Sequence, residues 1–332
     1  MVATTDTMTV SASPARGVRA FAWVMVSATF AYLIANYLLV WHEVPSPSSL
    51  FSGEMLAVVP TTIYALALAL PIFMVMRTPE TTLRADSARI SGIARFIIRA
   101  AFWGVFLVGL ADAAVSFLRV EEMLAGFVGQ ETADGWNFNK NRGPELHGPL
   151  ILLGIVIAAL TRSALGFQWL ALLVVIAELN IVLFRFIFSY EQAFMGDLVR
   201  FWYGALFLFA SAYTLLEDGH VRVDVLYAGM RDKTKGFINA WGSIIMGILF
   251  CWVILVMGMA TKSSIINAPL ISFEVSQSGF GMYVKYLMAG FLGVFAVTMM
   301  LQFCAYLLES VADWRGEDGS RLHTHDDELP VH

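Results

Sequence analysis

The chain has 332 residues, of which 58% are hydrophobic and only 14% charged, and its formal net charge is −5. One soluble core does not hide that much apolar side chain, so the composition predicts an integral membrane protein. Much of the modest negative charge lies near the C-terminus, and nothing in the distribution of charge points to a nucleic-acid partner.

Apolar runs near the 20 residues that a bilayer requires follow one another along the chain. They cover residues 20–41, 55–76, 96–118, 167–188, 198–216, 237–260 and 284–308. A shorter run, 147–161, is followed by Arg162 and then by the next apolar run. Together these two runs exceed one crossing, so we predict a tight helical hairpin there. The sequence thus predicts an all-α membrane protein with about eight transmembrane helices.

The remaining long segments are polar. Residues 1–18 are rich in small and polar side chains and are predicted to be disordered. Residues 119–147 contain many Gly and Asn residues, a composition typical of turns, and are predicted to form a loop. Residues 313–332 are predicted to be a polar, acidic tail.

Lysine and arginine are unevenly distributed among the segments that connect the spans. With eight spans and a cytoplasmic N-terminus, most of these residues lie on the cytoplasmic side of the membrane. With seven spans, the basic segments would lie on opposite sides of the membrane. The positive-inside rule therefore favours eight spans with both termini in the cytoplasm.

A compact polar patch interrupts two apolar runs at residues 215–227, which read LLEDGHVRVDVLY. Gly219 tolerates a positive φ and is predicted to end a helix. The alternation over 220–225 would suit a strand, but a lone strand beside a bilayer has no partner for its backbone. We predict instead that the chain lies in the membrane interface and that Asp224 caps a short amphipathic helix over 226–237.

This patch carries a family resemblance. The run DGHVRVDVL after a hydrophobic helix resembles the signature of the small, Q-type membrane subunit of tripartite ATP-independent periplasmic (TRAP) transporters. The run NIVLFRFIF, with Asn180 and Arg185, resembles that family's arginine-aromatic helix end. The resemblance covers about residues 168–310. Family members often have Trp and paired Glu before the next helix, where this chain has Glu191, Phe194 and Asp197.

The resemblance implies a function and a set of partners. It implies a bacterial inner-membrane protein that is not an enzyme and takes part in Na⁺-driven uptake of an organic acid. The substrate and Na⁺ sites are expected in a large permease subunit, for which this chain is a scaffold that binds no cofactor itself. A periplasmic substrate-binding protein and membrane lipids are the other expected partners. The alternative is a multi-pass interaction or assembly protein with no part in transport.

The resemblance also divides the chain. Residues 164–312 would be a four-helix unit like the small TRAP subunit, and residues 19–163 a four-helix membrane extension whose role no motif indicates. We expect the second unit to fold without residues 1–162.

Three ionisable residues stand out within the predicted spans: Asp112, Glu178 and Arg185. Charge at mid-bilayer costs several kcal/mol unless it is paired or hydrated, so these are candidates for structural or interface roles. Helical rise places Asp112 and Arg185 at similar depth, where they could pair and join the extension to the second unit. In the alternative, which we favour, Arg185 snorkels to the interface and Asp112 bonds a neighbouring backbone or hydroxyl group.

Glu178 lies deeper in its predicted span. An ion site normally needs several convergent ligands or broken helices, and no pair of segments interrupted by Gly or Pro occurs in the second unit. We therefore expect Glu178 to be protonated, or hydrogen-bonded to a partner helix in this chain or another subunit, with direct ion coordination as the alternative.

The polar patch supplies the remaining candidates. His220, Arg222 and Asp224 are expected to fix the helix end, contact lipid headgroups and dock against a partner loop. They have neither a nucleophile nor a pocket, so no catalytic role is predicted. No metal site is predicted either.

Overall fold

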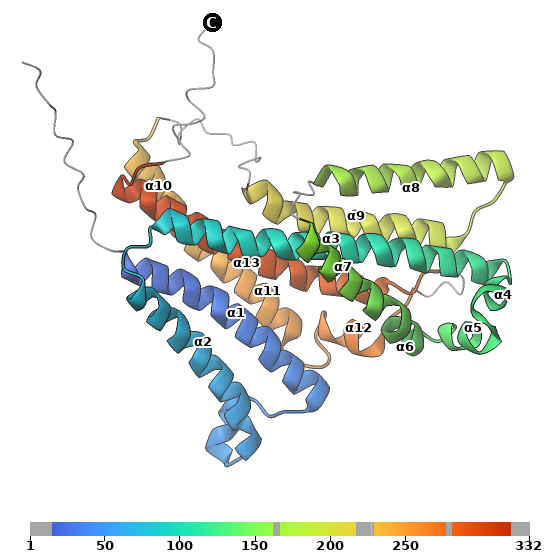
Figure 1. Cartoon of the computed structure of the whole chain (residues 1–332), viewed down its shortest axis with the longest axis horizontal. Helices are drawn as coiled ribbons and strands as arrows, with labels where there is room; N and C mark the ends of the chain where they lie inside the picture. The colour runs from blue at the N-terminus through green and yellow to red at the C-terminus, as the bar shows by residue number, and fades with distance from the viewer. Residues whose placement is uncertain (1–14, 162–166, 217–226, 228, 277–280, 320–332) are drawn as a thin grey trace, which may run out of the picture.

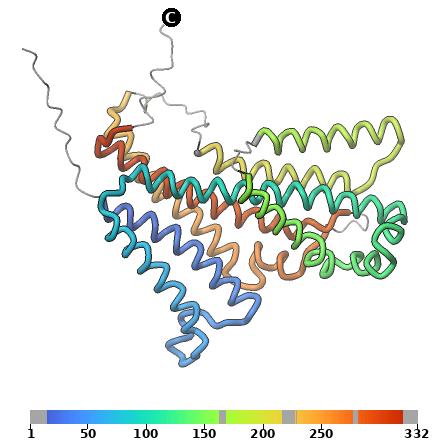
Figure 2. The backbone as a smooth tube through the Cα atoms, viewed as in Figure 1, coloured from blue at the N-terminus to red at the C-terminus, as the bar shows by residue number. Residues whose placement is uncertain are grey.

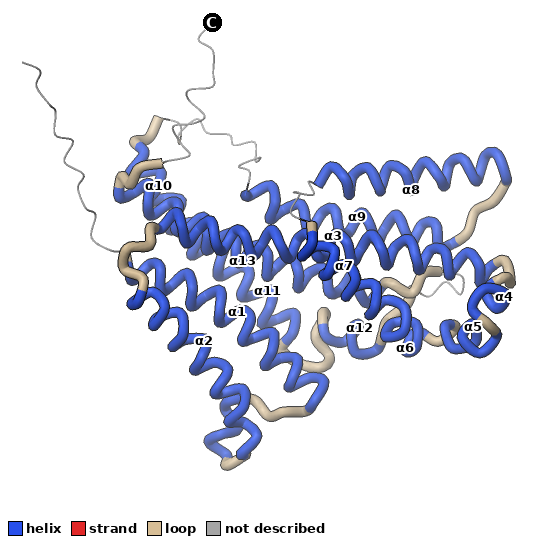
Figure 3. Tube along the Cα trace, in the orientation of Figure 1, coloured by secondary structure: helices blue, strands red, loops and turns tan. Residues whose placement is uncertain are grey.

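The computed structural model describes residues 15–161, 167–216, 227, 229–276 and 281–319. Within these ranges the chain is helical and contains no strand (Figure 3). Eight of the described helices are long and apolar enough to span a membrane. The prediction of an all-α membrane fold with about eight spans is confirmed.

The first half of the chain contains four long or intermediate helices and several short ones. In order these are α1 (Arg16–His42), the turns η1 (Pro47–Ser52) and η2 (Met55–Ala57), α2 (Val58–Arg77), α3 (Leu83–Val120), α4 (Leu124–Val128), α5 (Gln130–Trp136), α6 (Asn139–Arg142), the π-helical turn η3 (Gly143–His147) and α7 (Gly148–Leu160).

The second half contains α8 (Phe167–Phe188), α9 (Ala193–Leu216), α10 (Asp232–Gly242), the π-helical turn η4 (Ser243–Ile248), α11 (Leu249–Met259), α12 (Asn267–Ser272) and α13 (Lys285–Arg315). Helix α13 ends at Arg315 and is followed by its C-cap, Gly316, so the first residues of the predicted polar tail are helical. The φ of 72° at Gly316 suits glycine.

Two long helices, α3 and α13, form the centre of the molecule. They run side by side in opposite directions, with α1, α2 and α11 along one part of their length and α8 and α9 along the other (Figures 1 and 2). The most extensive packing of α13 is against α3 and α10. Helices α2 and α8 are peripheral, since α2 packs chiefly against α1 and α8 chiefly against α9.

Two hydrophobic clusters occupy the interior, and both combine residues from the predicted extension and the predicted second unit. One cluster joins α1 and α3 to α10, α11 and α13 through Val26, Ile90, Leu255 and Leu301. The other joins α3 to α8, α9 and α13. The two predicted units therefore have no separate cores, while the boundary near residue 163 stays a prediction.

Buried charges fix one end of the bundle. The Nε of Arg19 on α1 lies 2.7 Å from Asp86 on α3, and both side chains are buried. Arg84 at the start of α3 binds Glu309 and Asp313 near the end of α13. The start of α1 and the end of α13 thus both contact the start of α3, so these three helix ends lie at the same end of the bundle. Which face of the membrane this end occupies stays a prediction.

The predicted loop at residues 119–147 is wrong. The structure forms α4, α5, α6 and η3 there, and these short helices cover the end of α3 (Figure 1). The turn-forming residues separate the short helices: Gly129, with φ of 83°, lies between α4 and α5. The Gly and Asn residues therefore indicated where the chain turns, but the segments between the turns are short helices and not loop.

The predicted interfacial helix begins later than expected. Its described part starts at Asp232 and continues through η4 into the span of α11. The predicted helix cap at Asp224 and the predicted hairpin around Arg162 lie outside the described residues.

Candidate functional site

Asp112 is the centre of a buried polar cluster where the end of α3 meets η3 and the start of α13. Its Oδ1 lies 3.0 Å from the Nη1 of Arg142 and 3.1 Å from the Nε2 of His147, and all three side chains are fully buried. The structure therefore pairs Asp112 with Arg142. It does not bring Asp112 together with Arg185, so the hypothesis of that pair is wrong.

Arg142 makes further contacts with α3, with α5 and with the segment that precedes α13. Its Nη1 also lies 3.4 Å from Ser116 Oγ, its Nε donates to the backbone oxygen of Trp136, and its guanidinium stacks 4.2 Å from the Tyr283 ring. Only its Nη2 is buried without a hydrogen-bond partner. A buried guanidinium needs compensation of this kind, because an unpaired charge in the interior is very unfavourable.

His147 extends the cluster to α13. Its Nδ1 lies 2.9 Å from the hydroxyl oxygen of Tyr286, and the two rings stack. A neutral imidazole fits these contacts, with Nε2–H donating to Asp112 and Nδ1 accepting from the Tyr286 hydroxyl. Because Arg142 already balances the charge of Asp112, the assigned arrangement is electrically neutral.

The π-helical turn η3 brings Arg142 and His147 to the same carboxylate. Such a turn inserts an extra residue into a helix and redirects the side chains on either side of it. Gly143 within it packs against Phe273, where an added Cβ would lie 2.5 Å from a ring carbon. This position accepts only glycine without a shift of the aromatic ring.

The start of α13 is held by two carboxylates. The backbone N–H of Tyr283 donates to Asp112 Oδ2 at 2.7 Å, and the adjacent N–H of Met282 donates to Asp197 Oδ2 at 3.0 Å. Asp197, on α9, also accepts from Ser276 Oγ at 3.1 Å. A negative charge at a helix N-terminus is favoured by the helix dipole. Asp112 and Asp197 therefore hold, from two different helices, the two residues that lead into α13.

The cluster has the features of a structural junction. The side chains of Asp112, Arg142 and His147 are all fully buried. Within the described ranges, no three His, Cys, Asp or Glu side chains come together to hold a metal ion. Its chemistry is to fasten three segments that lie far apart in the sequence.

Glu178 and Arg185 lie on the peripheral helix α8. Glu178 is exposed near the middle of that helix, and no partner for it is found among the described residues. Arg185 is exposed near the end of the helix and lies 3.3 Å from Glu191, which precedes α9. Both residues thus belong to an outer face of the molecule.

The polar patch cannot be placed in the same way. His220, Arg222 and Asp224 all lie outside the described residues. Their predicted contacts with lipid headgroups and with a partner loop stay predictions.

Sequence reasoning missed Arg142, His147 and Asp197 as members of a site. Arg142 lies in a segment predicted to be a loop, and His147 lies at the edge of the shortest apolar run. The signal that could have found Arg142 is the pattern Asn-Arg-Gly-Pro before that run, since a basic residue at the end of a span is a natural partner for the intramembrane Asp112.

Comparison with known families gives the identity of the second half of the chain. Residues 171–313 match the family described as tripartite ATP-independent periplasmic transporters, DctQ component. This segment is similar to the small membrane component of TRAP transporters. The resemblance predicted over residues 168–310 is confirmed. The DctQ family is an inner-membrane transporter component and not an enzyme.

The DctQ segment begins within α8 and ends within α13, so α1 to α7 form an N-terminal extension to it. The buried cluster around Asp112 lies where that extension meets the segment. No curated protein and no solved structure matches the chain.

Proposed function

We propose that this chain is the static scaffold of a TRAP transporter that takes up an organic acid with Na⁺. In this proposal a periplasmic binding protein delivers the acid, and a large permease subunit contains the substrate and Na⁺ sites. The DctQ match supports the transporter assignment. The buried junction around Asp112, which fastens helices to one another, supports a scaffold role for this subunit.

The observation that carries the proposal is the position of Glu178. It lies about 16 Å from either end of the 22-residue helix α8, at the level of the bilayer centre, and it is exposed. A carboxylate facing lipid at that depth costs about 3 kcal/mol, and such residues normally face other protein. A second subunit that covers Glu178 removes this cost.

The face around Glu178 suits a partner in the membrane. Helix α8 packs against α9 and leaves its outer face free. Apart from Glu178 that face is largely apolar, and it exposes Leu172, Val175, Ile176, Leu179, Val182 and Phe186. We therefore assign this face to the large permease, with Glu178 bonded to a polar group of that subunit.

A pull-down from native membranes in mild detergent tests this assignment. The tagged full-length chain is expected to recover a large multi-span permease in about equal amount. Glu178→Leu is expected to reduce that recovery while leaving the chain itself folded, because it removes a charge from an exposed apolar face. The matched control is Glu191→Gln, whose exposed pair with Arg185 contributes little.

Equal recovery with Glu178→Leu would show that the permease binds elsewhere. Recovery of the chain alone, under conditions that keep other complexes intact, would favour the alternative of a membrane assembly protein with no part in transport. The coupling ion and substrate class need a separate measurement. Proteoliposomes that contain both membrane subunits and the binding protein are expected to accumulate an organic acid only under an inward Na⁺ gradient.

A further inference from the structure

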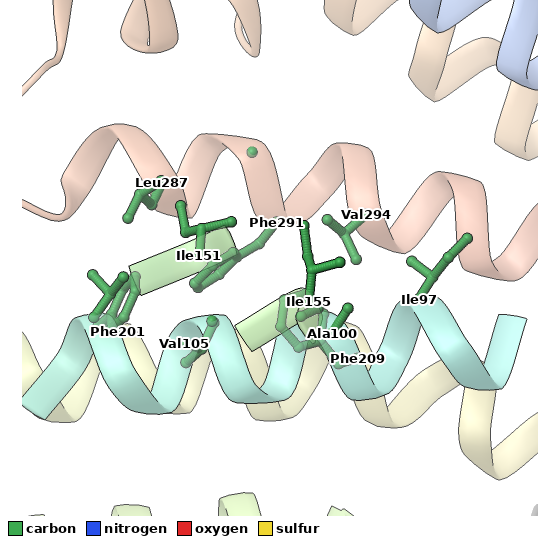
Figure 4. A pocket seen from close by; sticks show the side chains of 14 residues that line it. Ile97, Ala100, Val105, Ile151, Ile155, Phe201, Phe209, Leu287, Phe291 and Val294 are labelled. Carbon is green, nitrogen blue, oxygen red and sulfur yellow. The ribbon is translucent and has the colours of Figure 1, made fainter. Parts of the chain in front are cut away.

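An apolar cavity of about 260 Å³ lies between α3, α7, α9 and α13 (Figure 4). Two of these helices belong to the extension and two to the DctQ segment. All four belong to membrane-spanning segments. The cavity is therefore lined by segments that are long and apolar enough to span the bilayer.

The cavity has a buried floor and a partly exposed mouth. Its floor consists of buried side chains: Val105, Val108, Phe201, Phe209 and Phe291. Its mouth is bordered by partly exposed side chains: Ile97, Ala100, Val294 and Ile155, of which Ile155 on α7 is 40% exposed. The mouth is thus continuous with the lipid-facing surface of α3 and α7.

Small residues create the space. Gly104, Ala100 and Ala101 on α3 and Gly290 on α13 all line the cavity, and none has a side chain larger than methyl. Along α3 the lining extends from Ile97 to Val108, which corresponds to roughly 16 Å of helix. Figure 4 shows Ile97 at one end and Phe201 with Leu287 at the other. The cavity is long and narrow.

The lining decides the class of ligand. Water needs polar partners, and an apolar cavity of about 150 Å³ stays dry and binds a six-carbon ring. On that scale, a cavity of 260 Å³ holds roughly ten carbon atoms. An empty space of this size would deprive its lining of dispersion contacts. A hydrocarbon segment of about this length would restore those contacts.

We propose that this cavity binds one acyl chain of a bilayer phospholipid. Phospholipid chains are the hydrocarbon that surrounds the mouth, and a single chain fits the long, narrow shape. The bound chain fills the space between α7 of the extension and α9 and α13 of the DctQ segment. The acyl chain then fills the contact between the extension and the DctQ segment, so that this contact is close-packed as protein interiors are.

Native mass spectrometry of the purified full-length chain tests the proposal. The chain is extracted in a detergent without an alkyl chain, so that the detergent cannot supply the ligand. The wild type is expected to keep one phospholipid mass. Ala101→Leu, which places a side chain in the cavity, is expected to lose it, while Ala65→Leu on the exposed surface of α2 keeps it.

A photoactivatable phospholipid with a diazirine in one acyl chain provides a second readout that needs no variant. Its crosslinks are expected on α3, α9 and α13 peptides that contain the buried floor, where bulk lipid has no access. Crosslinks confined to exposed faces such as that of α2 would overturn the proposal.

Three further results would also overturn it. These are a wild type that carries no lipid, an Ala101→Leu variant that keeps its phospholipid, and a bound mass that corresponds to a free fatty acid. If Ala101→Leu fails to fold, Ala100→Leu at the mouth takes its place, and the crosslinking result decides.

Discussion

Asp112 and Asp197 accept hydrogen bonds from two consecutive backbone amides, those of Tyr283 and Met282. One carboxylate comes from α3 in the extension and the other from α9 in the DctQ segment. Between them they hold the start of α13, the 31-residue helix at the centre of the molecule. The N-terminal extension thus helps to position a helix of the DctQ segment.

Removing the charge of Asp112 should destabilise the protein strongly. Asp112→Leu leaves the guanidinium of Arg142 buried without its counter-ion and removes the acceptor for Tyr283 N–H. Breaking a buried pair in this way costs about 3–5 kcal/mol. Thermal unfolding of the purified chain in detergent, followed by intrinsic fluorescence, should show a clearly lower midpoint.

The control for Asp112 is a double variant. Asp112→Leu combined with Arg142→Met removes both charges, and apolar replacement of a buried pair is often close to neutral. We expect the double variant to be more stable than Asp112→Leu alone. The two residues do not interact if the double variant loses as much free energy of unfolding as Asp112→Leu and Arg142→Met lose together when each is made alone.

Asp197→Ala tests the second carboxylate. The change leaves the Met282 N–H buried without its partner, and we expect a loss of about 1–3 kcal/mol. Arg200→Ala is the matched control, because Arg200 pairs with the same carboxylate but has a side chain that is 74% exposed. An exposed pair contributes little, so Arg200→Ala should unfold within about 0.5 kcal/mol of the wild type. Equal effects of the two variants would contradict the role of Asp197 at the helix start.

The sequence alone predicted the spans well, for a physical reason. A membrane helix must be apolar for about 20 residues, and that requirement is visible without any knowledge of contacts. The sequence prediction underestimated the length of α3, which starts at Leu83 and not near residue 96. The first turns of α3 bury polar groups, such as Asp86 against Arg19 and Ser91 against Gln302, and a search for apolar runs misses polar residues that are paired.

The residues that surround Asp112 were harder to predict from the sequence. Helical rise gives the depth of Asp112 but not the direction in which it points, so it could not choose between Arg185 and Arg142. Arg142 reaches Asp112 only because η3 and α6 turn the chain back over the end of α3. That path depends on tertiary packing, including the contact of Gly143 with Phe273.

The contact between α3 and α7 depends on a pair of glycines. An added Cβ at Gly154 would lie 2.7 Å from the backbone nitrogen of Gly104, so Gly154→Ala must push the helices apart. We expect a loss of about 1–3 kcal/mol, measured by thermal unfolding. Gly92→Ala on α3 is the control, since a Cβ there meets open space and improves helix propensity by up to about 1 kcal/mol. Similar stability of the two variants would contradict close packing at Gly154.

The last prediction concerns the independence of the DctQ segment. From the sequence we predicted that the second unit folds without residues 1–162. The shared clusters change that expectation, because deleting the extension removes α1 and α3 from one core and α3 from the other. We expect residues 163–332 expressed alone to give little monodisperse protein in detergent. Residues 1–162 supplied as a second polypeptide should restore it, because the break falls between α7 and α8 and leaves every described contact intact. A stable, monodisperse product from residues 163–332 alone would mean that the buried contacts of Asp112 and Arg84 with this segment are dispensable for its fold, and that the extension serves some other purpose.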